Sequence, residues 1–306
     1  MINKKRKEDK ELNLLNKKMK KNNLIVFAGG LLVVFAVIIF IIAKSENTPT
    51  DNSNEKINIV VSILPQIEFA ENVGKDKVSV SAMIPPGFSP ATYEPSVEQL
   101  KKLNAADLYI RIGHIPFEKT QMKRLEDLNP KMKVIDSSKG IEIYENDPHI
   151  WMSPRLVKIQ VENICRALVE IDPENKDFYE KNKNEYLEKL DNLDLELQNA
   201  FSGMKGKKIL VFHPAFGYLA RDYGFEQIAI EIEGKEPSAE NLARIIDTAK
   251  KENIKTVFVQ KQFSQKSAKA IAQQIGGSVV PLDPLAKDYI ENLRRIGEEI
   301  SSKRIQ

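Results

Sequence analysis

Three side chains that can bind a metal ion each follow a short β-rich run and come just before a proline. His114 follows residues 108–113 and precedes Pro116, His213 follows residues 208–212 and precedes Pro214, and Asp283 follows Ser278–Leu282 and precedes Pro284. Proline favours the end of a strand and the start of a helix, because its φ is fixed and it has no N–H. In open α/β sheets the carboxyl ends of the strands face the ligand crevice. The pattern therefore predicts two imidazoles and a carboxylate that point toward ligand crevices.

The remaining histidine, His149, follows Asp147-Pro148, a dipeptide that favours a turn. Neutral imidazoles and a carboxylate together suit zinc in a four-coordinate site, with ligands at about 2.0–2.2 Å. The candidates lie too far apart in the sequence for a local zinc-finger pattern, so the fold must bring them together. Each histidine taken alone fits a hydrogen-bonded structural role better than a metal-binding role.

Length and charge describe a globular main body behind a basic amino-terminal tail. The chain has 306 residues, enough for two domains, and 42% of them are hydrophobic. The net charge is +3, but lysines concentrate in residues 1–22 and the rest of the chain is net acidic. Nucleic-acid binding by the main body is therefore not predicted. Cys165 is the single cysteine, which excludes an intramolecular disulfide and a lipid anchor on a cysteine near a cleavage site.

Residues 24–43 read LIVFAGGLLVVFAVIIFIIA and carry no charge. As a helix this run would reach about 30 Å, the thickness of the hydrocarbon core. The lysines before it place residues 1–23 in the cytosol as a basic tail. A cleavable signal sequence is the alternative, but its apolar region is usually about 7–15 residues long. We expect an uncleaved transmembrane anchor, a flexible polar tether over residues 44–56, and a single-pass protein of the cell membrane with its main domain outside.

The external part alternates β-rich runs with helical patterns, which is typical of an α/β fold with mainly parallel sheets flanked by helices. We expect an N-terminal lobe over residues 57–171, a linking helix over residues 172–203, and a C-terminal lobe over residues 204–306. The long helix has one apolar stripe, formed by Tyr179, Tyr186, Leu190, Leu193, Leu197 and Phe201. The pattern fits a surface helix on one domain and a rigid strut between two lobes equally well.

The external part, from Ile57 to about Ile300, resembles the zinc/manganese solute-binding proteins of ABC importers. The resemblance rests on several segments in family order, among them Tyr93-Glu94-Pro95-Ser96, Asp147-Pro148-His149-Ile150-Trp151, His213-Pro214-Ala215-Phe216, Gly234-Lys235-Glu236-Pro237-Ser238 and Asp283-Pro284-Leu285. It implies two α/β lobes joined by one long helix, with the metal in the cleft between them. It thus favours the strut interpretation.

The resemblance also implies a ligand set of three histidines and a carboxylate. Two histidines and the carboxylate carry over to His149, His213 and Asp283, whereas the first histidine is replaced by Ala91. His114 can substitute for it, water or a carboxylate such as Glu94 can complete a three-ligand site, or the pocket has turned to another solute. We expect the metal ligands to be His114, His149, His213 and Asp283. The cleft-lining candidates Glu231, Glu233, Glu236 and Gln260 fit ordinary solvent-facing positions better.

The leading hypothesis is a membrane-tethered, monomeric receptor that captures a divalent transition metal for an ABC permease. Zinc is preferred over manganese as the transported ligand, because three nitrogens and one oxygen suit it better. Protons should compete with the metal for the imidazoles. The alternatives are a cell-surface adhesin or structural protein with a degenerate metal pocket and, less well supported, a zinc hydrolase. We expect no enzyme, because the chain contains no His-Glu-x-x-His motif, nucleophile elbow or phosphate loop.

Overall fold

The computed structural model describes residues 17–20, 56–231, 237–263 and 265–303. The chain separates into two compact units, Met1–Glu55 and Lys56–Gln306. Within the first unit, residues 17–20 are helical. No helix in the described ranges is long and apolar enough to cross a bilayer. The expected anchor over residues 24–43, and nearly all of the expected tail and tether, lie outside these ranges.

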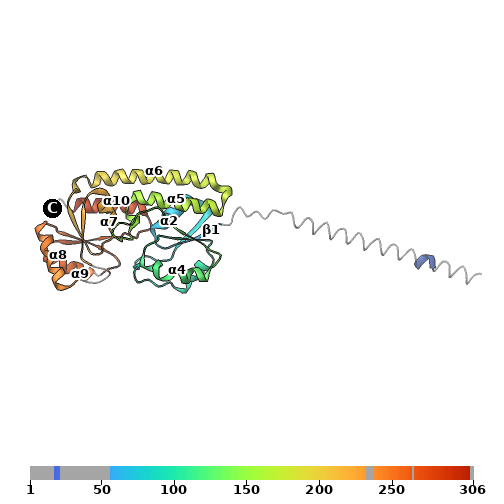
Figure 1. The fold of residues 1–306 in the computed structure, drawn as a ribbon, viewed down its shortest axis with the longest axis horizontal. Coiled ribbons are helices and arrows are strands. Elements are labelled where there is room, and N and C mark those ends of the chain that lie inside the picture. The colour runs from blue at the N-terminus through green and yellow to red at the C-terminus, as the bar shows by residue number, and fades with distance from the viewer. Residues whose placement is uncertain (1–16, 21–55, 232–236, 264, 304–306) are drawn as a thin grey trace, which may run out of the picture. The chain divides into compact units, whose positions relative to one another are not determined.

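The second unit contains two parallel β-sheets flanked by helices (Figure 1), as the alternating pattern predicts. In the described residues each sheet has four strands, in the order β2-β1-β3-β4 and β6-β5-β7-β8. The two sheets therefore share one topology. In each, the second strand is added on one side of the first strand and the later strands on the other side, so the strand order reverses between the two central strands. The strands are β1 Ile57–Val61, β2 Val78–Ala82, β3 Leu108–Arg111, β4 Lys133–Asp136, β5 Lys208–Val211, β6 Glu226–Ala229, β7 Thr256–Gln260 and β8 Ser278–Leu282.

Helices connect these strands, and local sequence explains several of their ends. Ser96 and Gln99 form a capping box at the start of α3, and Ser238 caps α8 by accepting the N–H of Asn241. After α9, Gly276 has a φ of +62°, which glycine adopts without strain. The helices are α2 Pro65–Gly74, α3 Val97–Asn104, α4 Pro116–Leu128, α5 Pro154–Ile171, α6 Lys176–Ala200, α7 Gly217–Tyr223, α8 Ala239–Lys251, α9 Gln265–Gln274 and α10 Tyr289–Ser302, with the short 3-10 segments η2 Lys75–Lys77, η3 Ile150–Met152, η4 Pro173–Asn175 and η5 Ser202–Met204.

Helix α6 runs along one side of the unit, past α5 and α10 (Figure 1). It packs against α2, which follows β1, and against α5, which comes after the first sheet in the sequence. It also packs against the C-terminal helix α10. The expected apolar stripe is buried, from Tyr179 through Leu197. Glu68 of α2 ties these helices together, because it accepts the Tyr186 hydroxyl at 2.9 Å and the backbone N–H of Tyr289 at 2.5 Å.

Buried side chains from both sheets form one continuous apolar core, in which Phe69, Tyr186, Phe201 and Tyr289 take part. A smaller cluster lies between the second sheet and helices α8 and α9. Cys165 is buried in α5, where a free thiol packs as a small apolar group. The continuous core limits how the loops at the strand ends can move independently of each other.

The strand–proline pattern predicts the strand ends better than it predicts the helix starts. Pro116 is the first residue of α4, as expected. Pro214 and Pro284, in contrast, lie in irregular segments, because α7 begins at Gly217 and α10 begins at Tyr289. The expectation that a helix begins directly at each proline is therefore wrong for two of the three candidates. His213 and Asp283 are held by loop contacts rather than by a helix start.

Candidate metal centre

The loop after β5 presents His213, and the neighbouring strand fixes the backbone of this residue. Gln260, the last residue of β7, accepts the His213 N–H at 3.2 Å through Oε1 and donates to its carbonyl at 2.8 Å through Nε2. Gln260 is 1% exposed, so this clamp is shielded from water. The imidazole also stacks on Phe263, with ring centroids 4.8 Å apart. The His213 ring therefore has a defined orientation.

The turn before η3 presents His149. The Asp147 carboxylate accepts the backbone N–H of His149 at 2.9 Å, which is the hydrogen bond expected of an Asp-Pro turn. The next aromatic residue, Trp151, is buried and donates its indole N–H to the carbonyl of Pro284 at 2.8 Å. This bond connects the turn to the loop after β8. Contacts of Asp147 and Trp151, which lie two residues before and two residues after His149, thus hold the backbone at His149 in place.

These two imidazoles face each other with their Nε2 atoms 3.2 Å apart. The opposite ring nitrogens both contact carboxylates: His149 Nδ1 lies 2.5 Å from Asp147 Oδ1, and His213 Nδ1 lies 3.0 Å from Glu231 Oε2. A carboxylate beside Nδ1 favours the tautomer with the proton on Nδ1, which leaves a lone pair on Nε2. Two such lone pairs at this separation repel each other unless a proton or a metal cation lies between them.

The separation of the two nitrogens matches a shared metal ion. Two nitrogen ligands of one tetrahedral zinc, each at about 2.0–2.1 Å, lie roughly 3.3 Å from each other. The rings border a small cavity of about 30 Å³, a volume that suits one water molecule or one ion. Residues that come before α6 in the sequence and residues that come after it both contribute to its lining. The lining consists of Ser89, Pro90, His149, Trp151, His213, Gln260, Gln262, Phe263, Pro284 and Leu285.

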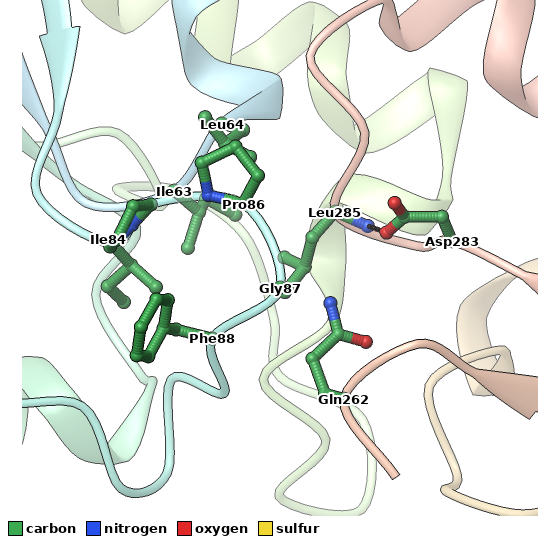
Figure 2. A pocket seen from close by; sticks show the side chains of 10 residues that line it. Ile63, Leu64, Ile84, Pro86, Gly87, Phe88, Gln262, Asp283 and Leu285 are labelled. Atoms are coloured by element: carbon green, nitrogen blue, oxygen red, sulfur yellow. Dashed lines mark hydrogen bonds between the residues drawn. The ribbon is translucent and has the colours of Figure 1, made fainter. Parts of the chain in front are cut away.

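Asp283 lies beside this cavity rather than in it. Its Oδ1 accepts the backbone N–H of Leu285 at 3.0 Å, and its Oδ2 lies 3.5 Å from Lys261 Nζ. Figure 2 shows Asp283, Gln262 and Leu285 across from Pro86, Gly87 and Phe88, around a second cavity of about 10 Å³. Gln262 and Leu285 line both cavities. Asp283 therefore lines a cavity that shares Gln262 and Leu285 with the histidine cavity.

His114 lies in the link between β3 and α4, and its ring contacts a residue just beyond the end of β4. Its Nε2 is 3.3 Å from the hydroxyl of Ser138, which follows β4. His114 does not line the cavity of His149 and His213. Across the described ranges, no three or more His, Cys, Asp or Glu side chains are grouped so as to hold a metal ion. The structure thus brings together two of the four expected ligands directly and a third in the adjoining cavity.

Other residues have functions that the sequence patterns did not assign. Glu231 is 3% exposed and bonded to His213, so its expected solvent-facing position is wrong. Asp147 and Gln260 likewise support the histidines. The Asp-Pro-His sequence could have indicated Asp147, because a ligand histidine usually donates its second N–H to a carboxylate. Glu94 is exposed, and Glu233 and Glu236 lie outside the described residues.

Comparisons with known proteins identify relatives that are named for metal uptake. The family model described as "ZnuA: Zinc-uptake complex component A periplasmic" matches residues 59–303. The chain is 30% identical to the high-affinity zinc uptake system protein ZnuA of Bacillus subtilis, over 82% of this chain and 86% of that protein. It is 27% identical to the manganese ABC transporter substrate-binding lipoprotein PsaA of Streptococcus pneumoniae, over 86% of this chain and 89% of the relative.

A solved structure extends the comparison to the fold. A crystal structure of ZnuA superposes with a TM-score of 0.79 at 45% sequence identity, covering 81% of this chain and 99% of the other. At this identity the similarity concerns sequence as well as architecture. Zinc and manganese are thus the metals named for the curated relatives.

Proposed function

The chain belongs to the ZnuA family of metal-binding solute receptors, and from this premise we propose that it captures a zinc ion between His149 and His213. Members of this family are substrate-binding proteins of metal importers rather than enzymes. Relatives are named for zinc and for manganese, so a divalent transition metal is the transported ligand. Zinc is the preferred ion here, because imidazole nitrogens are the ligands in direct reach of each other.

One observation carries this proposal: two Nε2 atoms lie 3.2 Å apart while both Nδ1 atoms contact carboxylates. This arrangement positions two lone pairs for one cation without any rearrangement of the rings. A histidine pair that only stabilised the fold would need a proton between the nitrogens, and neither ring would need its own carboxylate. The carboxylates also increase the basicity of the imidazoles toward a metal.

We propose Asp283 as the third ligand and His114 as the fourth. Asp283 reaches the ion when its carboxylate leaves Lys261 and turns past Gln262 into the histidine cavity. His114 reaches it only after its ring leaves Ser138. If His114 stays on Ser138, water takes the fourth position instead.

The proposal extends to the organisation of the chain. Residues 57–171 and 204–306 form two lobes, and residues 172–203, which include α6, form the strut between them. Residues 24–43 form a single membrane anchor with residues 1–23 in the cytosol and residues 44–56 as the tether. The monomeric receptor then delivers its metal to an ABC permease, since the name of the manganese relative assigns that protein to an ABC transporter.

A zinc titration of the full-length chain tests the metal-binding proposal. We expect one Zn²⁺ per chain for the wild type and no tight binding for His149→Ala combined with His213→Ala. His114→Ala should weaken binding by more than about 100-fold, beyond the range typical of a residue that only supports a ligand. The matched variant Ser138→Ala removes the partner of His114 and should leave the affinity unchanged or higher.

The results separate the parts of the proposal. Undiminished zinc binding by the double histidine variant would contradict the site itself. An unchanged dissociation constant for His114→Ala would remove His114 from the ligand set and leave a three-ligand site completed by water. Binding of Mn²⁺ more tightly than Zn²⁺ at equal pH would contradict the metal preference.

A further inference from the structure

The end of strand β7 lies between the two strands that lead to candidate ligands of the second sheet. β7 pairs with β5 on one side and with β8 on the other, and these strands precede His213 and Asp283. Gln260, the last residue of β7, clamps the backbone of His213. The next residue, Lys261, contacts Asp283. Two consecutive residues at the end of β7 therefore contact the histidine and the carboxylate.

The ion pair between Lys261 and Asp283 gives the carboxylate a cation in the metal-free chain. Lys261 Nζ lies 3.5 Å from Oδ2, and Oδ1 accepts the backbone N–H of Leu285. Both carboxylate oxygens therefore have a partner before any metal arrives. The Lys261 side chain is 66% exposed, whereas the Asp283 side chain is 24% exposed. The ammonium group can thus leave toward water more easily than the carboxylate can.

We propose that Lys261 sets the metal affinity of the site by competing with the metal for Asp283. The inference rests on the proposed function, because it requires Asp283 to be a metal ligand. When a divalent cation binds Asp283, it repels the ammonium group and weakens the ion pair. When the metal leaves, Lys261 returns and neutralises the carboxylate. Lys261 therefore weakens capture and assists release.

The size of this effect follows from the exposure of the pair. Ion pairs between solvent-exposed groups are weak and are screened by salt, so their removal changes an equilibrium about two- to fivefold. We therefore expect Lys261→Met to lower the dissociation constant for Zn²⁺ about two- to fivefold at low ionic strength. The difference from the wild type should shrink as the salt concentration rises. Lys261→Arg keeps the positive charge and should bind zinc like the wild type.

The experiment is a zinc titration of the full-length chain carrying Lys261→Met, Asp283→Asn or both substitutions. Asp283→Asn should weaken binding, and Lys261→Met should have no effect in the Asp283→Asn background, because the competition needs the carboxylate. The control is Lys266→Met, which removes an exposed lysine of α9. Lys266→Met should leave the dissociation constant unchanged.

The outcomes distinguish this inference from the proposed function. Equal tightening by Lys261→Met and Lys266→Met would overturn the inference, since it would show a general charge effect. An unchanged affinity of Lys261→Met, with Asp283→Asn weakened, would overturn it while Asp283 stays a ligand. A wild-type chain that binds no zinc, or an Asp283→Asn variant that binds normally, would instead overturn the proposed function or its ligand set.

Discussion

The rings of His149 and His213 meet edge to face, at an interplanar angle of 76°, with their Nε2 atoms 3.2 Å apart. The two rings come from opposite sides of α6 in the sequence. His149 lies in the turn before η3, and His213 lies in the loop after β5. The relationship therefore connects two distant parts of the sequence at one point. We expect binding of a cation at this point to stabilise the contact between these two parts, and loss of the cation to weaken it.

The carboxylates behind the histidines should contribute to metal affinity. Asp147→Asn and Glu231→Gln keep the shape of each side chain but remove the negative charge beside Nδ1. We expect each substitution to weaken zinc binding about tenfold, the lower end of the range for partners of ligand histidines. The check is competition with a chromophoric chelator, with the exposed Glu98→Gln as control. Unchanged affinities in both variants would show that the carboxylates serve only the fold.

Metal should stabilise the folded chain, because it binds the two imidazoles only when the fold brings them together. At a free zinc concentration 100 times the dissociation constant, the stabilisation is about 2.7 kcal/mol. For a domain of this size the melting temperature should rise by roughly 5–10 °C. Differential scanning calorimetry with zinc and with excess chelator measures the shift. A shift of equal size in the His149→Ala, His213→Ala double variant would place the metal elsewhere.

Trp151 should report metal binding by its fluorescence. It is the single tryptophan of the chain, and its ring centroid lies 5.1 Å from that of His149. Its indole N–H is bonded to the carbonyl of Pro284, next to Asp283. A cation at the histidine pair changes the field at the indole, so we expect the emission to change and to saturate at one Zn²⁺ per chain. Constant emission while calorimetry detects binding would argue for a site remote from Trp151.

Glu68 should make the stability of the unit depend on pH. Burial raises the pKa of Glu68 above its ordinary value, and the hydrogen bonds from Tyr186, Tyr289 and Ile290 offset only part of this effect. An acid whose pKa is higher in the folded state contributes stability that is full below the unfolded pKa. This contribution is lost as the pH rises through the folded pKa.

The Glu68→Gln variant isolates this contribution, because glutamine does not titrate. Relative to the wild type, we expect its free energy of unfolding to increase as the pH rises from about 4 to about 7. Urea unfolding at both pH values gives the difference, and the exposed Glu174→Gln serves as the control. A wild-type-minus-variant difference that does not change with pH would mean that Glu68 has the same pKa in both states.

The sequence predicts the sheets and helices of this chain well, because alternation of β-rich and helical runs is a local signal. The capping residues Ser96 and Ser238 and the buried stripe of α6 follow from such signals. The helix starts after Pro214 and Pro284 cannot be predicted from such local signals. Proline fixes its own φ but does not determine how many loop residues follow it before the helix begins.

The site is less predictable, because side-chain partners come from contacts across the fold. Local patterns place His213 and Asp283 at strand ends, but they cannot indicate that Lys261 reaches Asp283 or that Glu231 is buried behind His213. The same limit applies to His114. Its strand-end position is correct, whereas its contact with Ser138 depends on the neighbouring strand β4.

The central claim is that the Nε2 atoms of His149 and His213 bind the same ion, and X-ray absorption at the zinc edge tests it most directly. The full-length chain with one equivalent of zinc should show imidazole nitrogens at about 2.0–2.1 Å. The His149→Ala and His213→Ala variants should each lose one of these nitrogens or fail to retain the metal. A wild-type spectrum without imidazole scattering, or one that neither substitution changes, would contradict the claim.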